Sequence, residues 1–102
     1  MRDYSWGDVA MELSDARKRL DKIDNDMLEL FERRMEVVSR ISKYKESRGL
    51  PVRDEIREQE IIASVGEQVG EELAPYATRF TRAILEISRD YQREMREKSR
   101  LP

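Results

Sequence analysis

The fold is decided by residues 13–44, which read LSDARKRLDKIDNDMLELFERRMEVVSRISKY. Apolar side chains recur here every three or four residues, the spacing that places them on one face of an α-helix. We call this face the apolar seam; it consists of Leu13, Ala16, Leu20, Ile23, Met27, Leu30, Val37, Ile41 and Tyr44. No Gly or Pro interrupts the stretch before Gly49-Leu50-Pro51, so the sequence predicts one very long helix, from Leu13 to Ser47.

Two further helices are predicted after this break. Asp54 is placed to cap the start of the second helix, whose end Gly66 and Gly70 leave open. Pro75 suits the first turn of the third helix. Their apolar sides are formed by Ile56, Ile61, Ile62 and Val65, and by Tyr76, Phe80, Ile84, Ile87 and Tyr91. We therefore predict an all-α fold of three helices: one very long, one short and one medium.

Composition and charge exclude several classes of function. The 20 Lys and Arg residues nearly balance the 22 Asp and Glu residues, and a net charge of −2 gives no field that attracts nucleic acid or an anionic membrane. No apolar run is long enough to span a bilayer. The absence of Cys and His excludes disulfides, the usual zinc sites and every mechanism based on these side chains. We expect a soluble, cytoplasmic chain with no metal and no cofactor.

The length of the first helix predicts a dimer. A chain of 102 residues suffices for one domain, which we place at residues 11–98, between a flexible N-terminal extension at 1–10 and a frayed tail at 99–102. The long helix spans about 50 Å at ~1.5 Å per residue, whereas a compact domain of ~100 residues has a radius of gyration of about 13 Å. The rest of one chain cannot cover such a rod, so we expect an intertwined homodimer.

One charged residue, Arg34, occupies a position of the apolar seam. It falls in the same heptad position as Leu20, Met27 and Ile41, so its side chain is expected to face the interior of the helical bundle. The ordinary explanation is an arginine that pairs with an acid or extends its charged end to water. The alternative is an anion-binding site inside the bundle.

Two more cations lie on a flank of the seam. Lys45 follows Arg34 by eleven residues, so it lies on nearly the same face, about 16 Å along the helix. Arg17 is about 42 Å from Lys45 along the same helix, too far for one small-molecule site. In an antiparallel dimer, Arg17 of one protomer joins Arg34 and Lys45 of the other, and two-fold symmetry gives two such sites.

The later helices add polar residues at positions that also have structural explanations. Asp54, Arg57 and Glu58 open the second helix, where a capping Asp and charged first-turn residues are common. Ser88 and Gln92 lie one turn apart on the apolar side of the third helix, where polar pairs also occur for structural reasons.

Taken together, these residues and their spacing resemble the all-helical chorismate mutases. The resemblance covers about residues 11–96. It rests on Leu13-x3-Arg17, Ile23-Asp24-x3-Leu28-x-Leu30-x3-Arg34, Lys45, Pro51-Val52-x-Asp54-x2-Arg57-Glu58 and Ser88-x3-Gln92. It implies an intertwined three-helix dimer that converts chorismate to prephenate in phenylalanine and tyrosine biosynthesis. This pericyclic reaction needs no nucleophile, base, metal or cofactor, which agrees with a chain that lacks Cys and His.

The resemblance also implies which residues bind the substrate. Arg34 and the partner subunit's Arg17 would bind the two carboxylates, because guanidinium groups match carboxylates in a two-point geometry. Ser88 would support a carboxylate, and Arg57 would help to bind the substrate.

A second group of residues is implied to act on the reacting atoms. Lys45 and Gln92 would donate hydrogen bonds to the ether oxygen, where negative charge grows as the C–O bond breaks. Arg57 would add positive charge beside that oxygen. Glu58 would accept a hydrogen bond from the ring hydroxyl, assisted by the region of Asp54.

Two other functions remain alternatives. One is another enzyme on the same fold, an isochorismate-pyruvate lyase or an aminodeoxychorismate mutase; the presence of Glu58 and Gln92 favours the chorismate mutase. The other is a non-catalytic helical dimer that acts as a regulatory or assembly module. The sequence leaves open whether the domain is free-standing or part of a fused prephenate dehydratase or dehydrogenase.

Overall fold

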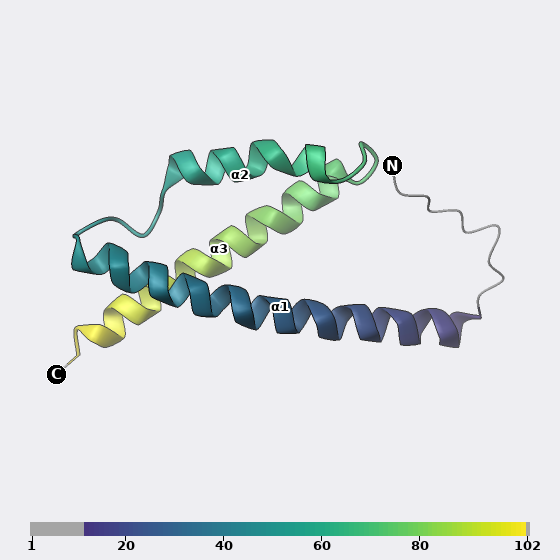
Figure 1. Cartoon of the computed structure of the whole chain (residues 1–102), viewed down its shortest axis with the longest axis horizontal. Coiled ribbons are helices and arrows are strands. Elements are labelled where there is room, and N and C mark those ends of the chain that lie inside the picture. The colour runs from purple at the N-terminus through teal and green to yellow at the C-terminus, as the bar shows by residue number, and fades with distance from the viewer. Residues whose placement is uncertain (1–11, 102) are drawn as a thin grey trace. The chain divides into compact units, whose positions relative to one another are not determined.

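The computed structural model describes residues 12–101, which form three helices and no strand: α1 (Leu13–Ser47), α2 (Glu55–Gln68) and α3 (Ala74–Ser99) (Figure 1). The predicted all-α class with one very long, one short and one medium helix is confirmed. The chain divides into two compact units within α1, after Glu36. The extension predicted at residues 1–10, and the last residue of the predicted tail, lie outside the described residues.

The end of α1 is set by a glycine. Gly49 has a φ of 67°, in the left-handed region that side chains with a Cβ disfavour, and the described part of the chain has no other positive φ. The Leu50 amide then donates to the Lys45 carbonyl at 2.8 Å, which satisfies one of the carbonyls left over at the helix end. The predicted stop at Gly49-Leu50-Pro51 is confirmed.

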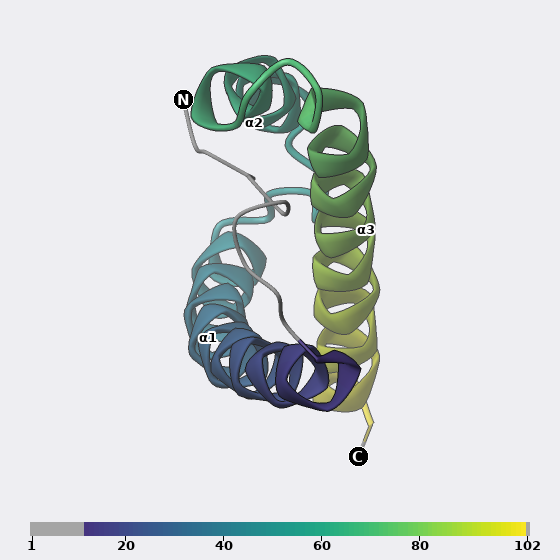
Figure 2. The same ribbon diagram turned by 90° about the vertical axis from the view of Figure 1, so that its right-hand side faces the viewer.

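Capping residues fix the starts of α2 and α3. Asp54 has extended backbone angles, and its Oδ1 accepts a hydrogen bond from the Arg57 amide at 3.0 Å, as an N-cap requires. Pro75 lies in the first turn of α3, where its missing amide proton costs nothing. The Leu73 amide donates to the Gly70 carbonyl at 3.0 Å in the short connection between the two helices. Figure 2 looks nearly along α2, with α3 leading away from this connection.

The interior of the unit that begins at Val37 is small and partly polar. Its buried residues are Val38, Ser42, Val65, Leu85, Ser88 and Gln92. The buried residues of α1 belong to the flank of the apolar seam rather than to the seam itself. The seam residues Val37, Ile41 and Tyr44 stay exposed. The single chain therefore leaves this part of the seam available to another surface.

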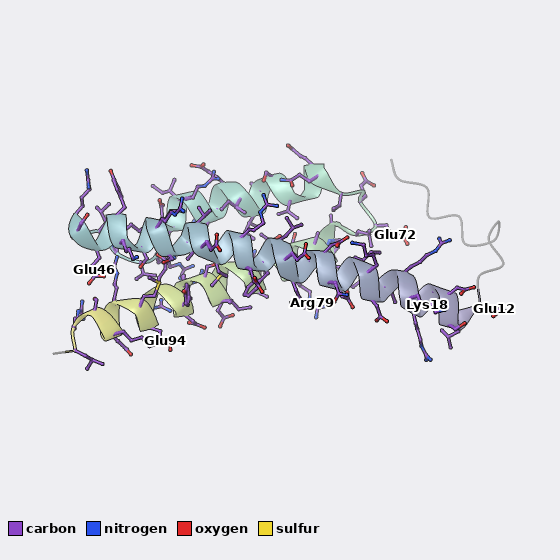
Figure 3. All side chains as sticks on the ribbon, turned by 60° about the horizontal axis from the view of Figure 1, so that its bottom comes forward. Glu12, Lys18, Glu46, Glu72, Arg79 and Glu94 are labelled. Atoms are coloured by element: carbon purple, nitrogen blue, oxygen red, sulfur yellow. The ribbon has the colours of Figure 1, made fainter. Side chains whose placement is uncertain are left out.

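The seam is also exposed in the unit that ends at Glu36. The exposed fractions are 64% for Leu13, 56% for Leu20, 52% for Ile23, 44% for Met27 and 58% for Leu30. Charged side chains cover the other faces of the helices, including Lys18 of α1 (Figure 3). A continuous apolar face of this length is typical of a surface that another protein covers. Among residues 12–101, no helix combines the length and apolar character that a membrane crossing needs.

Candidate functional site

Lys45 lies in the last turn of α1, next to the connection that leads to α2. Its side chain is half-buried, and Nζ donates a hydrogen bond to the Val52 carbonyl at 2.9 Å. An ammonium group has three protons, so this bond leaves two donors for other acceptors. Arg96 of α3 donates from Nη2 to the Leu50 carbonyl at 2.7 Å, so side chains of α1 and α3 both hold this connection.

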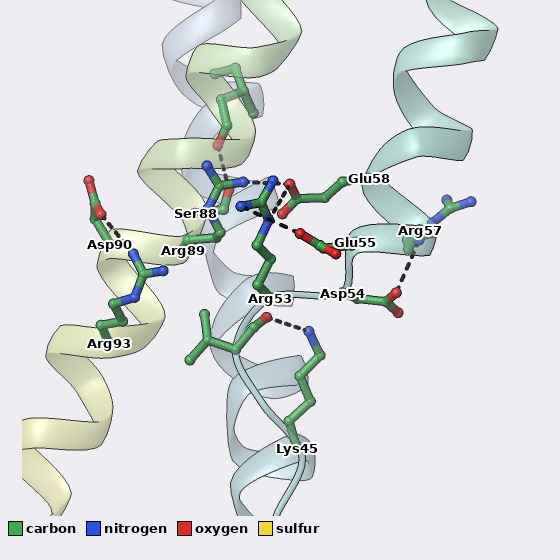
Figure 4. A network of polar contacts seen from close by, with 12 residues as sticks. Lys45, Arg53, Asp54, Glu55, Arg57, Glu58, Ser88, Arg89, Asp90 and Arg93 are labelled. Carbon is green, nitrogen blue, oxygen red and sulfur yellow. Dashed lines mark hydrogen bonds and ion pairs between the residues drawn. The ribbon is translucent and has the colours of Figure 1, made fainter.

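Asp54 and Arg57 occupy the first turn of α2. Asp54 caps the helix, so its carboxylate is directed at the backbone of that turn. The side chain of Arg57 is 65% exposed, and its guanidinium lies 3.4 Å from the Glu60 carboxylate one turn later. Figure 4 shows Arg57 extending away from Glu58. The Arg57 backbone thus contacts Asp54, while its guanidinium lies near Glu60.

Glu58 forms an ion pair with Arg89 that is shielded from solvent. Its Oε1 lies 2.5 Å from Nη1 of Arg89, and the two side chains are only 16% and 18% exposed. Nε of Arg53 lies 3.5 Å from the same oxygen, but the Arg53 side chain is 53% exposed. Two guanidinium groups thus hold one carboxylate between α2 and α3 (Figure 4).

Ser88 and Gln92 are both buried on α3, one turn apart. Ser88 Oγ donates to the Ile84 carbonyl at 2.8 Å, a local bond within the helix. Gln92 is 6% exposed, and its Oε1 has no hydrogen-bond partner among residues 12–101. A buried amide oxygen without a donor is costly. Contacts within the described chain therefore do not explain why the Gln92 amide oxygen is buried.

Arg17 and Arg34 belong to the unit that ends at Glu36. Arg17 is exposed, whereas Arg34 is half-buried despite its charge. Burial lowers the pKa of Arg34 from its ordinary value, because surroundings that exclude water disfavour the charged guanidinium. An arginine is nevertheless charged at every physiological pH. That Arg34 faces the interior of the helical bundle stays a prediction.

A hollow of about 380 Å³ lies between α2 and α3. It is lined by Arg53, Glu55, Glu58, Gln59, Ile62, Ala63, Arg82, Leu85, Glu86 and Arg89. Of the eight predicted site residues, only Glu58 lines it. Its walls combine charged side chains with the apolar surface of both helices.

Residues 12–101 contain no group of three or more Asp, Glu, His or Cys side chains arranged to hold a metal ion. The unit that begins at Val37 contains the cations Lys45, Arg53 and Arg89, the shielded carboxylate of Glu58, and the buried Ser88 and Gln92. Such a set can bind an anion and stabilise developing negative charge.

Sequence reasoning missed Arg89 and Arg53. Arg89 is separated from Glu58 by 31 residues, so no local pattern connects them. A signal was present on α3, since Arg89 follows the buried Leu85 by four residues and precedes the buried Gln92 by three. This spacing places a charge beside the buried face of the helix.

Comparisons with known proteins point to one family. Residues 16–93 match the family described as chorismate mutase type II. The chain is also similar to the T-protein of Haemophilus influenzae, with 40% identity over 40 residues, which cover 39% of this chain and 11% of that protein. The match thus spans about a tenth of that curated relative. No solved structure matches the chain.

Proposed function

Because this chain belongs to the chorismate mutase type II family, we propose that it catalyses the rearrangement of chorismate to prephenate. The family match carries this proposal: residues 16–93 include all eight polar positions, from Arg17 to Gln92. We further propose that the protein acts in the cytoplasm, in the biosynthesis of phenylalanine and tyrosine.

The proposed catalysis consists of conformational restriction and electrostatic stabilisation. The substrate is a dianion that must adopt a compact conformer in which the bond-forming carbons approach each other. Arg34 and the partner subunit's Arg17 bind its carboxylates, with support from Ser88 and added charge from Arg57. A rate enhancement of about 10⁶-fold requires about 8 kcal/mol of barrier reduction. Holding the reactive conformer and stabilising the new charge are together sufficient for this.

Lys45 and Gln92 are proposed to act at the ether oxygen. Negative charge grows on this oxygen only as the C–O bond breaks, so donors placed there lower the barrier more than they tighten substrate binding. Lys45 has donors left beyond its bond to Val52. Gln92 is buried, and its amide nitrogen is the group that would donate to the ether oxygen; its unpartnered Oε1 can only accept a hydrogen bond.

Glu58 and Asp54 are proposed to act at the ring hydroxyl. A carboxylate accepts hydrogen bonds, so Glu58 is suited to accept one from the ring hydroxyl. Its location on the wall of the hollow between α2 and α3 leaves it open to a small molecule. Asp54 assists by fixing the first turn of α2, which carries Glu58.

The active enzyme is proposed to be an intertwined homodimer. The exposed apolar seam needs a cover, and a second copy of the same helix has a matching face. In this arrangement the partner subunit's Arg17 completes each site. Arg17 is exposed in the described chain, as a residue that reaches into another subunit must be.

The test is an ultraviolet assay of chorismate consumption by the purified protein, with identification of the products. We expect prephenate without release of pyruvate; pyruvate release would instead indicate a lyase. Lys45→Ala should abolish most of the activity, whereas Lys43→Ala, an exposed lysine two residues earlier on α1, serves as the matched control. A folded, dimeric protein that leaves chorismate unchanged would refute the proposed function.

A further inference from the structure

We propose that Arg89 is a positioning residue that fixes Glu58 for recognition of the substrate's ring hydroxyl; this inference rests on the proposed function. No motif of the sequence assigns Arg89 a role. The geometry that points to it is the shielded ion pair between α2 and α3 (Figure 4).

The Arg89–Glu58 pair differs from the other ion pairs among residues 12–101. Both of its side chains are less than a fifth exposed, and the pair joins two helices across 31 residues. Six other ion pairs each include a side chain that is at least half exposed, and most join residues three or four apart on one helix. Exposed pairs of that kind contribute little, because water screens the charges. Water screens the attraction between Arg89 and Glu58 far less.

Stability alone does not explain such a pair. Removing two charges from water costs about as much as their attraction returns, so apolar side chains of similar size are often equally stabilising. A fixed carboxylate orientation is what the pair provides. Glutamate has three rotatable side-chain bonds, and a guanidinium that reaches across from α3 restricts them to one arrangement.

The orientation of Glu58 suits a hydroxyl donor. The contacts from Arg89 and Arg53 both end on Oε1. Oε2 is the oxygen that accepts the substrate hydroxyl in this proposal. Both Glu58 and Arg89 line the hollow of about 380 Å³, whose lining also includes the apolar side chains of Ile62 and Leu85. The ring of the substrate would meet the apolar side chains of Ile62 and Leu85 there, with Glu58 as the carboxylate that Arg89 orients.

Arg53 makes a weaker contact to the same carboxylate and can be compared with Arg89. It lies 3.5 Å from the same oxygen but is 53% exposed, so its hold on Glu58 is weaker and more screened. If Arg89 acts by positioning Glu58, then Arg53→Met should have the same type of effect at a smaller magnitude.

The experiment compares two substrates. One is chorismate, and the other is the analogue that lacks the ring hydroxyl. We expect Arg89→Met to lower kcat/KM for chorismate by about 10–100-fold, the scale of one charge-assisted hydrogen bond, and to change kcat/KM for the analogue by less than about threefold. Arg89→Lys, which keeps the charge without the planar fork, should recover part of the loss. Arg93→Met is the matched control, because Arg93 is an exposed arginine of the same helix, paired with Asp90.

The double variant gives an independent readout. Once Glu58→Gln is present, Arg89→Met should cost little more for chorismate, because both changes remove the same interaction. Equal losses for both substrates, or additive losses in the double variant, would overturn the inference. If Arg89→Met does not fold, the same comparison with Arg89→Lys decides it. Wild-type protein that converts neither substrate would refute the proposed function instead, so the two failures are distinguishable.

Discussion

Replacing Gln92 by methionine should make the protein more stable and less active at the same time. Gln92 is 6% exposed, and its Oε1 is buried without a hydrogen-bond partner in the described chain. Methionine has a similar length and flexibility, and its thioether needs no partner. The substitution therefore keeps the packing and removes an unsatisfied polar group.

The expected magnitudes follow from these two observations. A buried polar group without a partner costs about 1–3 kcal/mol. If Gln92→Met recovers even the lower limit, the melting temperature should rise by about 4–8 °C for a domain of this size. The same change removes a proposed donor to the ether oxygen, and the loss of one such donor lowers kcat by about 10²–10³-fold.

Thermal unfolding by circular dichroism measures the first effect, at one fixed protein concentration because dimerisation links stability to concentration. The rate of chorismate consumption measures the second. Gln68→Met on α2 is the control: Gln68 is exposed, its amide contacts Ser64 at 3.2 Å, and its replacement should change stability by less than about 0.5 kcal/mol. A lower melting temperature for Gln92→Met would show that the amide is satisfied in the native protein and would refute the reasoning.

The remaining predictions concern the shared site, the charged donors and the first turn of α2. Mixing Arg17→Ala with Arg34→Ala protein should restore activity toward about a quarter of wild type, because about half the dimers are mixed and each of these holds one intact site; mixed dimers without activity would exclude a shared site. Lys45→Ala should reduce kcat/KM strongly and change the melting temperature little, since a lysine near a helix end contributes only about 0.3–1 kcal/mol to stability. Normal turnover would contradict the proposed contact between Lys45 and the ether oxygen. Gln92→Glu should be inactive at neutral pH and partly recover as the pH falls, because only the protonated carboxyl donates a hydrogen bond; a pH profile identical to that of wild type would contradict this. Asp54→Ala should lower the free energy of unfolding by about 0.5–2 kcal/mol through loss of the bond to the Arg57 amide, whereas Asp54→Asn should keep most of it; chemical denaturation measures both.

The helix boundaries were predictable because their causes are local. Gly49 ends α1, Asp54 caps α2 and Pro75 begins α3, and each acts on atoms within four residues of itself. A sequence displays such signals directly. The same applies to the length of α1, which needs only an uninterrupted periodic pattern.

The contacts between helices were less predictable. Which flank of the seam lies inside the chain depends on how α2 and α3 pack, so the burial of Val38 and Ser42 did not follow from periodicity alone. The pair of Glu58 and Arg89 joins positions 31 residues apart, and its partners were chosen by packing rather than by spacing. The roles of Lys45 and of the other predicted site residues came from resemblance and stay predictions.

The exposed apolar seam of α1 has a consequence for how this protein tolerates mutation. In the proposed two-fold dimer every residue of the seam occurs twice, so one codon change alters two places in the same assembly. Leu20→Ala would remove two leucine side chains at once, and its cost would appear doubled in a denaturation experiment. The doubling also favours improvement, since a single substitution that improves a contact with a different residue of the partner does so at two symmetric places. Residues on the charged outer faces of the helices also change in both copies, but they lie outside the proposed interface, so such a change leaves the contact between the subunits intact.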